Sequence, residues 1–195
     1  MDTMRNEPVD SFRPKSSVGW LWVLALTLLM VVPLSIAFAY DPPAPDEVLI
    51  VWLSMIPLFG LAIWFLAVVV YFPRMRYDLG VDALVIAYGP LLRYSVSYAH
   101  ITDIAVTNMR FSPWSSFRFP GLALWKVQYT GMGQVRMCST RSHKGVLLIT
   151  AGEKRYGISP AEEDRFVHGL RSNVERAAPY TTDGTPMEDT APRLQ

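Results

Sequence analysis

The chain has 195 residues and a nearly neutral balance of 18 lysines and arginines against 17 aspartates and glutamates. Its single cysteine, Cys138, excludes an intramolecular disulfide, and a chain without disulfides suits a reducing cytoplasm. The charge is uneven: residues 19–72 contain no lysine or arginine, whereas residues 73–177 contain fourteen basic and eight acidic groups, a local net charge of +6. The basic part of the chain therefore follows directly after its most hydrophobic part.

Two long uncharged runs come first in the chain. Residues 19–40 and 48–72 contain no charged side chain, and each run is as long as the roughly 20 apolar residues that a helix needs to cross a bilayer. Tryptophan and tyrosine residues lie at the ends of these runs, as expected at a membrane interface. We therefore predict two transmembrane helices, which the short link DPPAPDE joins into an antiparallel hairpin over 19–72.

The first run has an alternative interpretation as a cleaved signal peptide. The triplet Ala37-Phe38-Ala39 resembles an A-x-A cleavage site. A signal peptide usually has an apolar region of about 7–15 residues, and this run is well beyond that length. The uncleaved span is favoured, and cleavage would leave the orientation of the second span unchanged.

The basic residues near the spans predict the orientation. The N-terminal segment 1–18 carries Arg5, Arg13 and Lys15, and Arg74 and Arg76 follow the second span, whereas the link is acidic. Because basic residues concentrate in cytoplasmic loops, we expect a multi-pass protein of the cell membrane with both termini in the cytoplasm.

The periodicity changes to alternation after the second span, which indicates strands. In LWKVQYT, Trp125, Val127 and Tyr129 share one face, and the loop 131–133 leads into a second alternating segment. Gly89-Pro90 is a comparable turn signal between two earlier segments. About seven short strands are predicted, over 83–88, 91–98, 101–106, 124–130, 134–140, 146–150 and 154–158.

A helix is predicted directly after the last strand. Ser159 suits an N-cap, Pro160 the first helical position, and Glu162 a capping box with Ser159. Apolar residues recur at three- and four-residue spacings up to Ala177 and form one stripe. The segment 178–195 has little apolar content and no period, so we expect a disordered tail.

These elements predict a cytoplasmic domain over 73–177, a strongly bent sheet or open barrel of antiparallel strands with a C-terminal helix that covers one end. The segments YDLGVDALVIAYG, YAHITDIAV, the stretch from Gly121 to Gly133, and YGISPAEEDRF resemble the bacterial pleckstrin-homology-like (PH-like) family. The resemblance covers 76–177 and implies a PH-type barrel, which in that family often follows one or two membrane spans. The expected fold class is thus an α-helical transmembrane hairpin followed by a mainly β PH-like barrel capped by an α-helix.

Reactive residues do not gather into a recognisable motif. Cys138 and the three histidines lack metal-ligand spacing. Ser139 and His143 lie in a polar loop without a third catalytic partner, and Gly131-x-Gly133 continues into a strand, with Arg136 at the third position of a dinucleotide fingerprint. We therefore predict no catalytic residue, no metal, no cofactor and no small-molecule substrate.

One stretch, NMRFSPWSSFRFPGLALW (108–125), combines aromatic and basic residues without a strand or helix period. Such residues suit a membrane interface, where rings lie at headgroup depth and arginine pairs with phosphates. The alternative, which we favour slightly, is that the rings fold back over the sheet as a small core. The candidate membrane or partner contacts are Arg110, Phe111, Trp114, Phe117 and Arg118.

The predicted function is a membrane-anchored, non-catalytic binding or scaffolding module that presents its domain to lipid headgroups, a protein partner or copies of itself. Phosphoinositide binding is not expected, because the segment 79–84 has no lysine or arginine. Nucleic-acid binding is not expected either, since no recognition helix is evident. The alternative is an accessory subunit of a membrane enzyme or transporter that docks through small residues of the hairpin, Gly60, Ala62 and Ala67.

Overall fold

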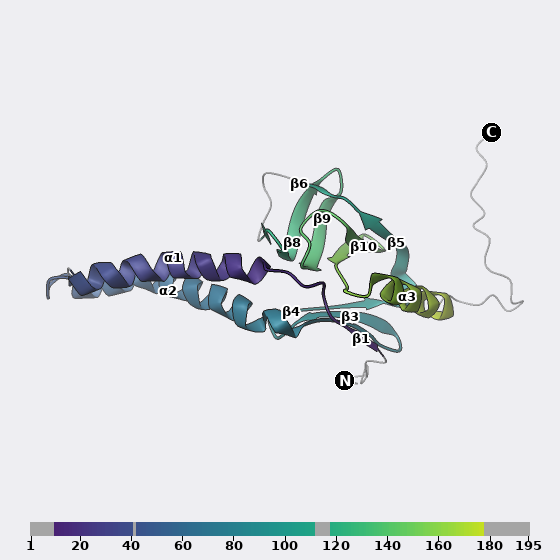
Figure 1. Ribbon diagram of the computed structural model, residues 1–195, viewed down its shortest axis with the longest axis horizontal. Coiled ribbons are helices and arrows are strands. Elements are labelled where there is room, and N and C mark those ends of the chain that lie inside the picture. The colour runs from purple at the N-terminus through teal and green to yellow at the C-terminus, as the bar shows by residue number, and fades with distance from the viewer. Residues whose placement is uncertain (1–9, 41, 112–117, 178–195) are drawn as a thin grey trace, which may run out of the picture.

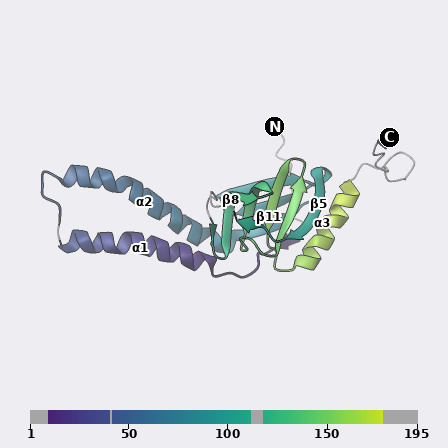
Figure 2. The same ribbon diagram turned by 90° about the horizontal axis from the view of Figure 1, so that it is seen from above.

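The computed structural model describes residues 10–40, 42–111 and 118–177. Two long helices project side by side from one end of a β-rich domain, and a third helix lies at the opposite end (Figures 1 and 2). The molecule is therefore elongated, with the helical hairpin and the C-terminal helix separated by two β-sheets.

The hairpin consists of α1 (Gly19–Tyr40) and α2 (Val48–Tyr71). At about 1.5 Å per residue, these helices are roughly 33 and 36 Å long, which compares with about 30 Å for the hydrocarbon core of a bilayer. Both are long and apolar enough to cross a membrane, by length and composition. Most of their large apolar side chains are exposed, and such a surface is stable beside lipid rather than water. The predicted bounds 19–40 and 48–72 agree with the helices to within one residue.

The first sheet has four antiparallel strands in the order β1-β2-β3-β4. A short 3₁₀ turn, η1 (Phe72–Arg74), connects α2 to this sheet, and another, η2 (Tyr98–His100), follows it. The strands are β1 (Asp10–Phe12), β2 (Met75–Leu79), β3 (Ala83–Tyr88) and β4 (Leu92–Ser97).

The second sheet follows the order β5-β10-β11-β9-β8-β6, and β7 also pairs with β8. Its pairs are antiparallel except for β9 and β11, which are parallel. The strands are β5 (Ile101–Thr107), β6 (Arg110–Phe111), β7 (Arg118–Phe119), β8 (Leu122–Thr130), β9 (Gly133–Ser139), β10 (Val146–Ala151) and β11 (Lys154–Ile158).

The predicted fold class is confirmed: two apolar helices precede a PH-like β-sandwich, and a helix follows it. All seven predicted strands are present. One detail differs, because the sheets do not close into a barrel of purely antiparallel strands. The hairpin of β10 and β11 inserts β11 beside β9, so the chain passes from β9 to β10 without pairing them and β9 acquires a parallel neighbour.

The C-terminal helix α3 (Glu163–Ala177) packs over the end of the sandwich. Phe166 and Leu170 are fully buried, and the ring of Phe166 meets that of Tyr77 edge-on at 6.2 Å between centroids. The ring of Phe12 meets Phe166 in the same way at 5.2 Å. Three elements that are far apart in sequence, namely β1, β2 and α3, therefore share one part of the core.

The described part of the chain before α1, residues 10–18, packs with the β domain, whereas the sequence predicted a separate segment over 1–18. Its described part begins at β1, which pairs with β2 in the register Phe12↔Tyr77. The N–H of Lys15 donates to the Ser159 carbonyl at 2.8 Å, and the N–H of Ala161 donates to the Arg13 carbonyl at 2.9 Å. Phe12 is 5% exposed, so the segment covers apolar surface that the remaining strands leave open.

The start of α1 is fixed against the second sheet by a close main-chain contact. The Ser17 hydroxyl donates to the Gly121 carbonyl at 2.6 Å. A Cβ atom at Gly19 would overlap that same carbonyl group. Gly121 itself has φ +83°, a conformation that glycine adopts at little cost. The two glycines therefore allow the helix to begin directly on the surface of the β domain.

The end of α2 is fixed by Tyr88 of β3. The Phe72 N–H at the helix end turns back to the Val69 carbonyl, so the Val68 carbonyl lacks its usual donor four residues later. The Tyr88 hydroxyl donates to this carbonyl at 2.6 Å. Burial raises the pKa of the tyrosine above its ordinary value, so the hydroxyl remains a donor throughout the physiological range. Both helices thus have fixed junctions with the domain.

The predicted cap of the C-terminal helix is wrong. The helix begins at Glu163, and the first intrahelical bond runs from the Phe166 N–H to the Glu162 carbonyl at 2.9 Å. The Ser159 hydroxyl instead lies 2.9 Å from both the backbone nitrogen and the hydroxyl of Thr140. Ser159 is buried at the end of β11, and its hydroxyl satisfies the buried N–H of Thr140. The hydroxyl therefore does not cap the helix, which starts four residues later.

The other two residues of the predicted capping box also have different roles. Pro160 forms an isolated bridge with Pro14 and is not helical. The Glu162 carboxylate pairs with Arg165 at 3.1 Å. The N-terminus of the helix is instead stabilised by two acidic residues in its first turn, Glu163 and Asp164, which complement the positive end of the helix dipole.

Candidate functional site

Part of the predicted aromatic and basic contact segment can be examined directly. Trp114 and Phe117 lie outside the described residues, as does the side chain of Phe111. Arg110 is exposed on β6, opposite Thr130 of β8. Arg118 is half-buried on β7. The structure therefore does not bring the five predicted residues together on one described surface.

Arg118 lies near groups of the domain interior. Burial raises the pKa of Tyr129 to about 12, and the nearby Arg118 charge opposes this rise. Burial also lowers the pKa of His143, with the charges of Lys144 and Arg118 acting in the same direction. The neighbouring Phe119 packs against the main core. The 118–119 end of the segment thus agrees with the interpretation as core, and the membrane interpretation stays a prediction for Trp114 and Phe117.

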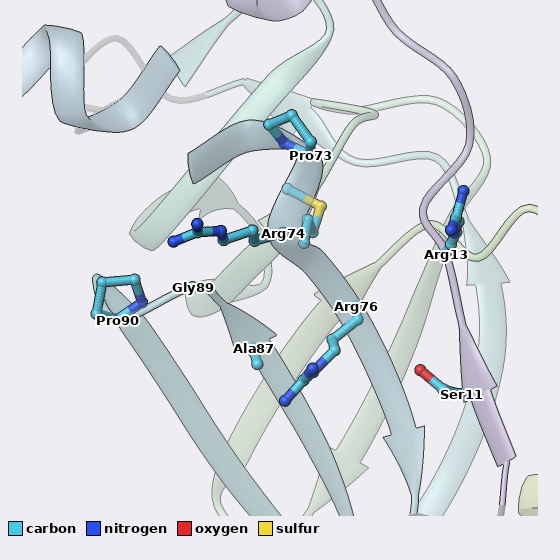
Figure 3. A pocket seen from close by; sticks show the side chains of 9 residues that line it. Ser11, Arg13, Pro73, Arg74, Arg76, Ala87, Gly89 and Pro90 are labelled. Atoms are coloured by element: carbon cyan, nitrogen blue, oxygen red, sulfur yellow. The ribbon is translucent and has the colours of Figure 1, made fainter. Parts of the chain in front are cut away.

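A hollow lies where the hairpin meets the first sheet (Figure 3). It has a volume of about 600 Å³, within the range of roughly 300–1,000 Å³ that is usual for small-molecule sites. We call it the juxtamembrane pocket because it adjoins the end of α2, a candidate membrane span. It is lined by Ser11, Arg13, Pro73, Arg74, Met75, Arg76, Ala87, Gly89 and Pro90.

The three arginines of the juxtamembrane pocket come from both sides of the hairpin. Arg74 ends the η1 turn that follows α2, and Arg76 lies two residues further along in β2. Arg13 comes from the chain before α1, directly after β1. The register Phe12↔Tyr77 brings this segment alongside β2, and Figure 3 shows Arg13 and Ser11 on the chain segment next to that of Arg76. Strand pairing, rather than sequence proximity, therefore assembles the cluster.

The surroundings of the arginines leave the juxtamembrane pocket positively charged. Arg76 pairs with Asp78, with 2.9 Å between Nε and Oδ2, and the same carboxylate accepts a hydrogen bond from the Ser11 hydroxyl at 2.6 Å. The Arg74 guanidinium lies 5.1 Å from the centre of the Tyr71 ring. Within the part of the chain that the structure describes, Arg13 and Arg74 have no carboxylate partner. The lining of the pocket thus contributes three guanidinium groups, of which only that of Arg76 is paired with a carboxylate among the described residues.

From the sequence alone, these arginines predicted only the orientation of the hairpin. Arg74 and Arg76 are recognisable as basic residues after a span, but Arg13 reaches them only because β1 joins β2. The one signal for that pairing is Phe12, an aromatic residue among polar ones. Three residues are too few to show alternation, so the juxtamembrane pocket was not predictable from periodicity.

The described residues contain no group of three or more His, Cys, Asp or Glu side chains that could hold a metal ion. Cys138 is fully buried, and burial raises the pKa of its thiol above the ordinary value. Buried neutral thiols are inert as nucleophiles. The polar groups of the juxtamembrane pocket are guanidinium and hydroxyl groups, which suit the binding of an anion.

The family comparison identifies the class of the protein. The family model described as "Bacterial PH domain" matches residues 75–174, from the start of β2 to within α3. The chain therefore belongs to the bacterial PH domain family, and its two apolar N-terminal helices are compatible with a hairpin anchor. No curated protein and no solved structure matches the chain.

Proposed function

We propose that this protein is a membrane-anchored, non-catalytic binding module. The hairpin spans the cell membrane twice, both termini are cytoplasmic, and the PH-like domain presents its membrane-proximal surface to lipid headgroups or to a protein partner. The observation that carries the proposal is that one sheet receives the chain from both ends of the hairpin, through β1 before α1 and β2 after α2.

The pairing of β1 with β2 supports two crossings. The start of α1 and the end of α2 lie on the same domain, so the two helices leave and return on one side of the bilayer. The acidic link with Asp46 and Glu47 lies at the far end of the hairpin (Figure 2). Because the arginines gather at the domain end, the positive-inside rule places the domain in the cytoplasm.

The chemistry of the membrane-proximal surface supports binding rather than catalysis. Arginine remains protonated in proteins and so does not exchange protons as an acid or base. It forms paired hydrogen bonds to carboxylate and phosphate oxygens. The PH-like fold alone suggests binding only by analogy with other proteins of that fold. The proposal therefore rests on these side chains and on their place beside the hairpin.

The orientation can be tested with single cysteines and a membrane-impermeant maleimide on intact cells. Glu153, in the exposed β10–β11 turn, and Asp46, in the link, provide positions at opposite ends of the molecule. With the native cysteine retained, Asp46→Cys is expected to react from outside, and Glu153→Cys only after the membrane is permeabilised. The opposite pattern, or equal labelling of both variants, would contradict the proposal.

Cys138 provides the internal control for this experiment. Its side chain is buried and its pKa is raised by that burial, so the unsubstituted protein is expected to remain unlabelled even after permeabilisation. The ordinary thiol pKa is about 8.5. Since the folded pKa is higher, the neutral buried thiol favours folding fully below that pH, and this contribution falls as the pH rises above it. Labelling near pH 7 therefore avoids the range in which Cys138 favours unfolding.

A second candidate function, an accessory subunit that docks through the hairpin, is supported by one observation. Gly60 lies on the exposed surface of α2, and among the described residues nothing lies within 4 Å of a Cβ placed there. Small residues allow close helix contacts in membranes. A single membrane protein that co-migrates with the full-length chain on a native gel would favour this candidate.

A further inference from the structure

We propose that the juxtamembrane pocket binds the phosphate of an anionic phospholipid drawn from the cytoplasmic leaflet. This inference rests on the proposed function, because it requires that the domain lie against that leaflet. It assigns a ligand class and three binding residues, Arg13, Arg74 and Arg76. The argument depends on the position of the pocket, on its unbalanced charge and on the fixed attachment of its arginines.

The position of the pocket is that of a lipid headgroup. Pro73 and Arg74 line it and belong to the turn that directly follows α2. On the other side of the hairpin, Arg13 is separated from the start of α1 by five residues, 14–18. A lipid beside α2 would keep its acyl chains along the apolar helix while its phosphate reached the arginines at the surface.

The charge of the pocket selects an anion. The positive charge of Arg76 is offset by its ion pair with Asp78. Among the described residues, Arg13 and Arg74 have no carboxylate to neutralise them. Guanidinium groups form bidentate hydrogen bonds with phosphate. The same surplus of positive charge repels the trimethylammonium group of choline, so phosphatidylcholine is a poorer ligand than phosphatidylglycerol.

Each arginine is attached to a fixed part of the fold. Arg74 packs over the Tyr71 ring at 5.1 Å, and Arg76 is held by Asp78 at 2.9 Å. The main chain of Arg13 is held by the Ala161 N–H at 2.9 Å. Groups that are already ordered lose less conformational entropy when a ligand binds, so the pocket is suited to a specific headgroup contact rather than a diffuse attraction.

The pocket lies at one end of the β2–β3 hairpin, and the turn between the two strands lies at the other end. The turn segment 79–84 contains no lysine or arginine. The arginines instead lie near the start of β2, level with the end of β3 at Gly89. A headgroup site at this end is next to the hairpin, whereas the β2–β3 turn points away from it.

The test uses the full-length protein in a neutral detergent and isothermal titration calorimetry. The ligands are short-chain phosphatidylglycerol, phosphatidylcholine of the same chain length, and soluble glycerol phosphate. We expect phosphatidylglycerol to bind more tightly than the other two ligands. Arg13→Gln and Arg74→Gln are each expected to lower its affinity about fivefold, the factor that corresponds to one basic residue near an anionic surface.

Arg171→Gln is the matched control, because Arg171 is exposed on α3 at the end of the molecule away from the hairpin. An equal loss of affinity in this variant would indicate diffuse attraction and overturn the pocket. Glycerol phosphate that binds as tightly as the lipid would indicate a soluble phosphate ester and overturn the lipid assignment. Unchanged affinity in Arg13→Gln, whose fold is checked by thermal unfolding, would overturn the proposal even if Arg74→Gln unfolds.

Cysteine labelling separates this proposal from the proposed function. If the lipid test fails while Glu153→Cys remains protected from labelling in intact cells, the lipid site is wrong and the proposal of a membrane-anchored module still holds. External labelling of Glu153→Cys would remove the proposed function and the lipid site together.

Discussion

At the scale of single residues, Ser159 links two neighbouring strands of the second sheet, β11 and β9, to β2 of the first sheet. Its hydroxyl lies 2.9 Å from both the nitrogen and the hydroxyl of Thr140 after β9, and the Ser159 N–H donates to the Tyr77 hydroxyl at 3.3 Å. The Tyr77 hydroxyl in turn donates to the Cys138 carbonyl at 2.8 Å. Burial raises the pKa of Tyr77, so this chain of hydrogen bonds keeps its protons at all ordinary pH values.

The first prediction compares Ser159→Ala with Glu162→Ala. Removing the Ser159 hydroxyl leaves the buried Thr140 N–H without its acceptor, which should lower the free energy of unfolding by about 1–3 kcal/mol. Glu162 is exposed and pairs only with Arg165 in the described structure, so its replacement should change stability by less than about 0.5 kcal/mol. Chemical unfolding of the full-length protein in detergent, followed by circular dichroism, measures both. Equal losses would restore the capping box that the sequence predicted.

At the scale of elements, the sequence predicts the bounds of helices and strands most accurately where an uncharged or apolar run is continuous. The bounds of α1 and β3 agree with their predicted ranges residue by residue, since an uncharged run or a bounded apolar run is visible without knowledge of neighbours. The parallel pairing of β9 and β11 was not predictable, because alternation shows which face is buried but not which strand lies alongside.

Short elements depend on their partners. The pattern from Ser159 to Glu162 satisfies a local capping rule. The Ser159 hydroxyl nevertheless accepts a hydrogen bond from the buried Thr140 N–H, so a tertiary contact prevails over the local preference. The three-residue β1 exists because β2 offers an open edge and Phe166 an apolar surface. The juxtamembrane pocket depends on β1 and was missed for the same reason, although Arg74 and Arg76 were recognisable as basic residues directly after a long apolar helix.

The second prediction tests how β1 is held. Phe12 is 5% exposed and packs edge-on against Phe166, so Phe12→Ala removes most of the apolar attachment of a strand of only three residues. We expect the segment to detach and trypsin to cleave the detergent-solubilised protein after Lys15, a site that is slow in the native chain. Val18→Ala is the control, because Val18 lies in the same segment and is 63% exposed. Resistance of Phe12→Ala equal to that of the control would show that the backbone pairing alone holds β1.

At the scale of the whole molecule, the domain is connected to the hairpin at more than its two covalent links. Tyr88 holds the end of α2, Ser17 holds the start of α1, and the ring of Trp64 in α2 stacks on Trp125 of β8 at 5.4 Å. Trp125 has φ +63°, a conformation that is uncommon for residues other than glycine. Such backbone strain persists where surrounding contacts determine it, and here the contact with α2 is one of them. The domain is therefore held in one orientation, with the juxtamembrane pocket beside the hairpin.

The third prediction follows from these connections. A protease site inserted between Pro43 and Ala44 would divide the chain in the link, far from every contact named above. After cleavage in mild detergent we expect the N-terminal piece to elute with the rest of the protein on gel filtration, because strand pairing, the packing of Phe12 and the helix contacts hold it without the covalent link. Adding Phe12→Ala to the cleaved chain should release a fraction of the piece, since α1 and its junction with the domain would then be its main remaining contacts. Separation of the pieces without that substitution would mean that the domain is tethered loosely, and the juxtamembrane pocket would then lose its fixed place beside the hairpin.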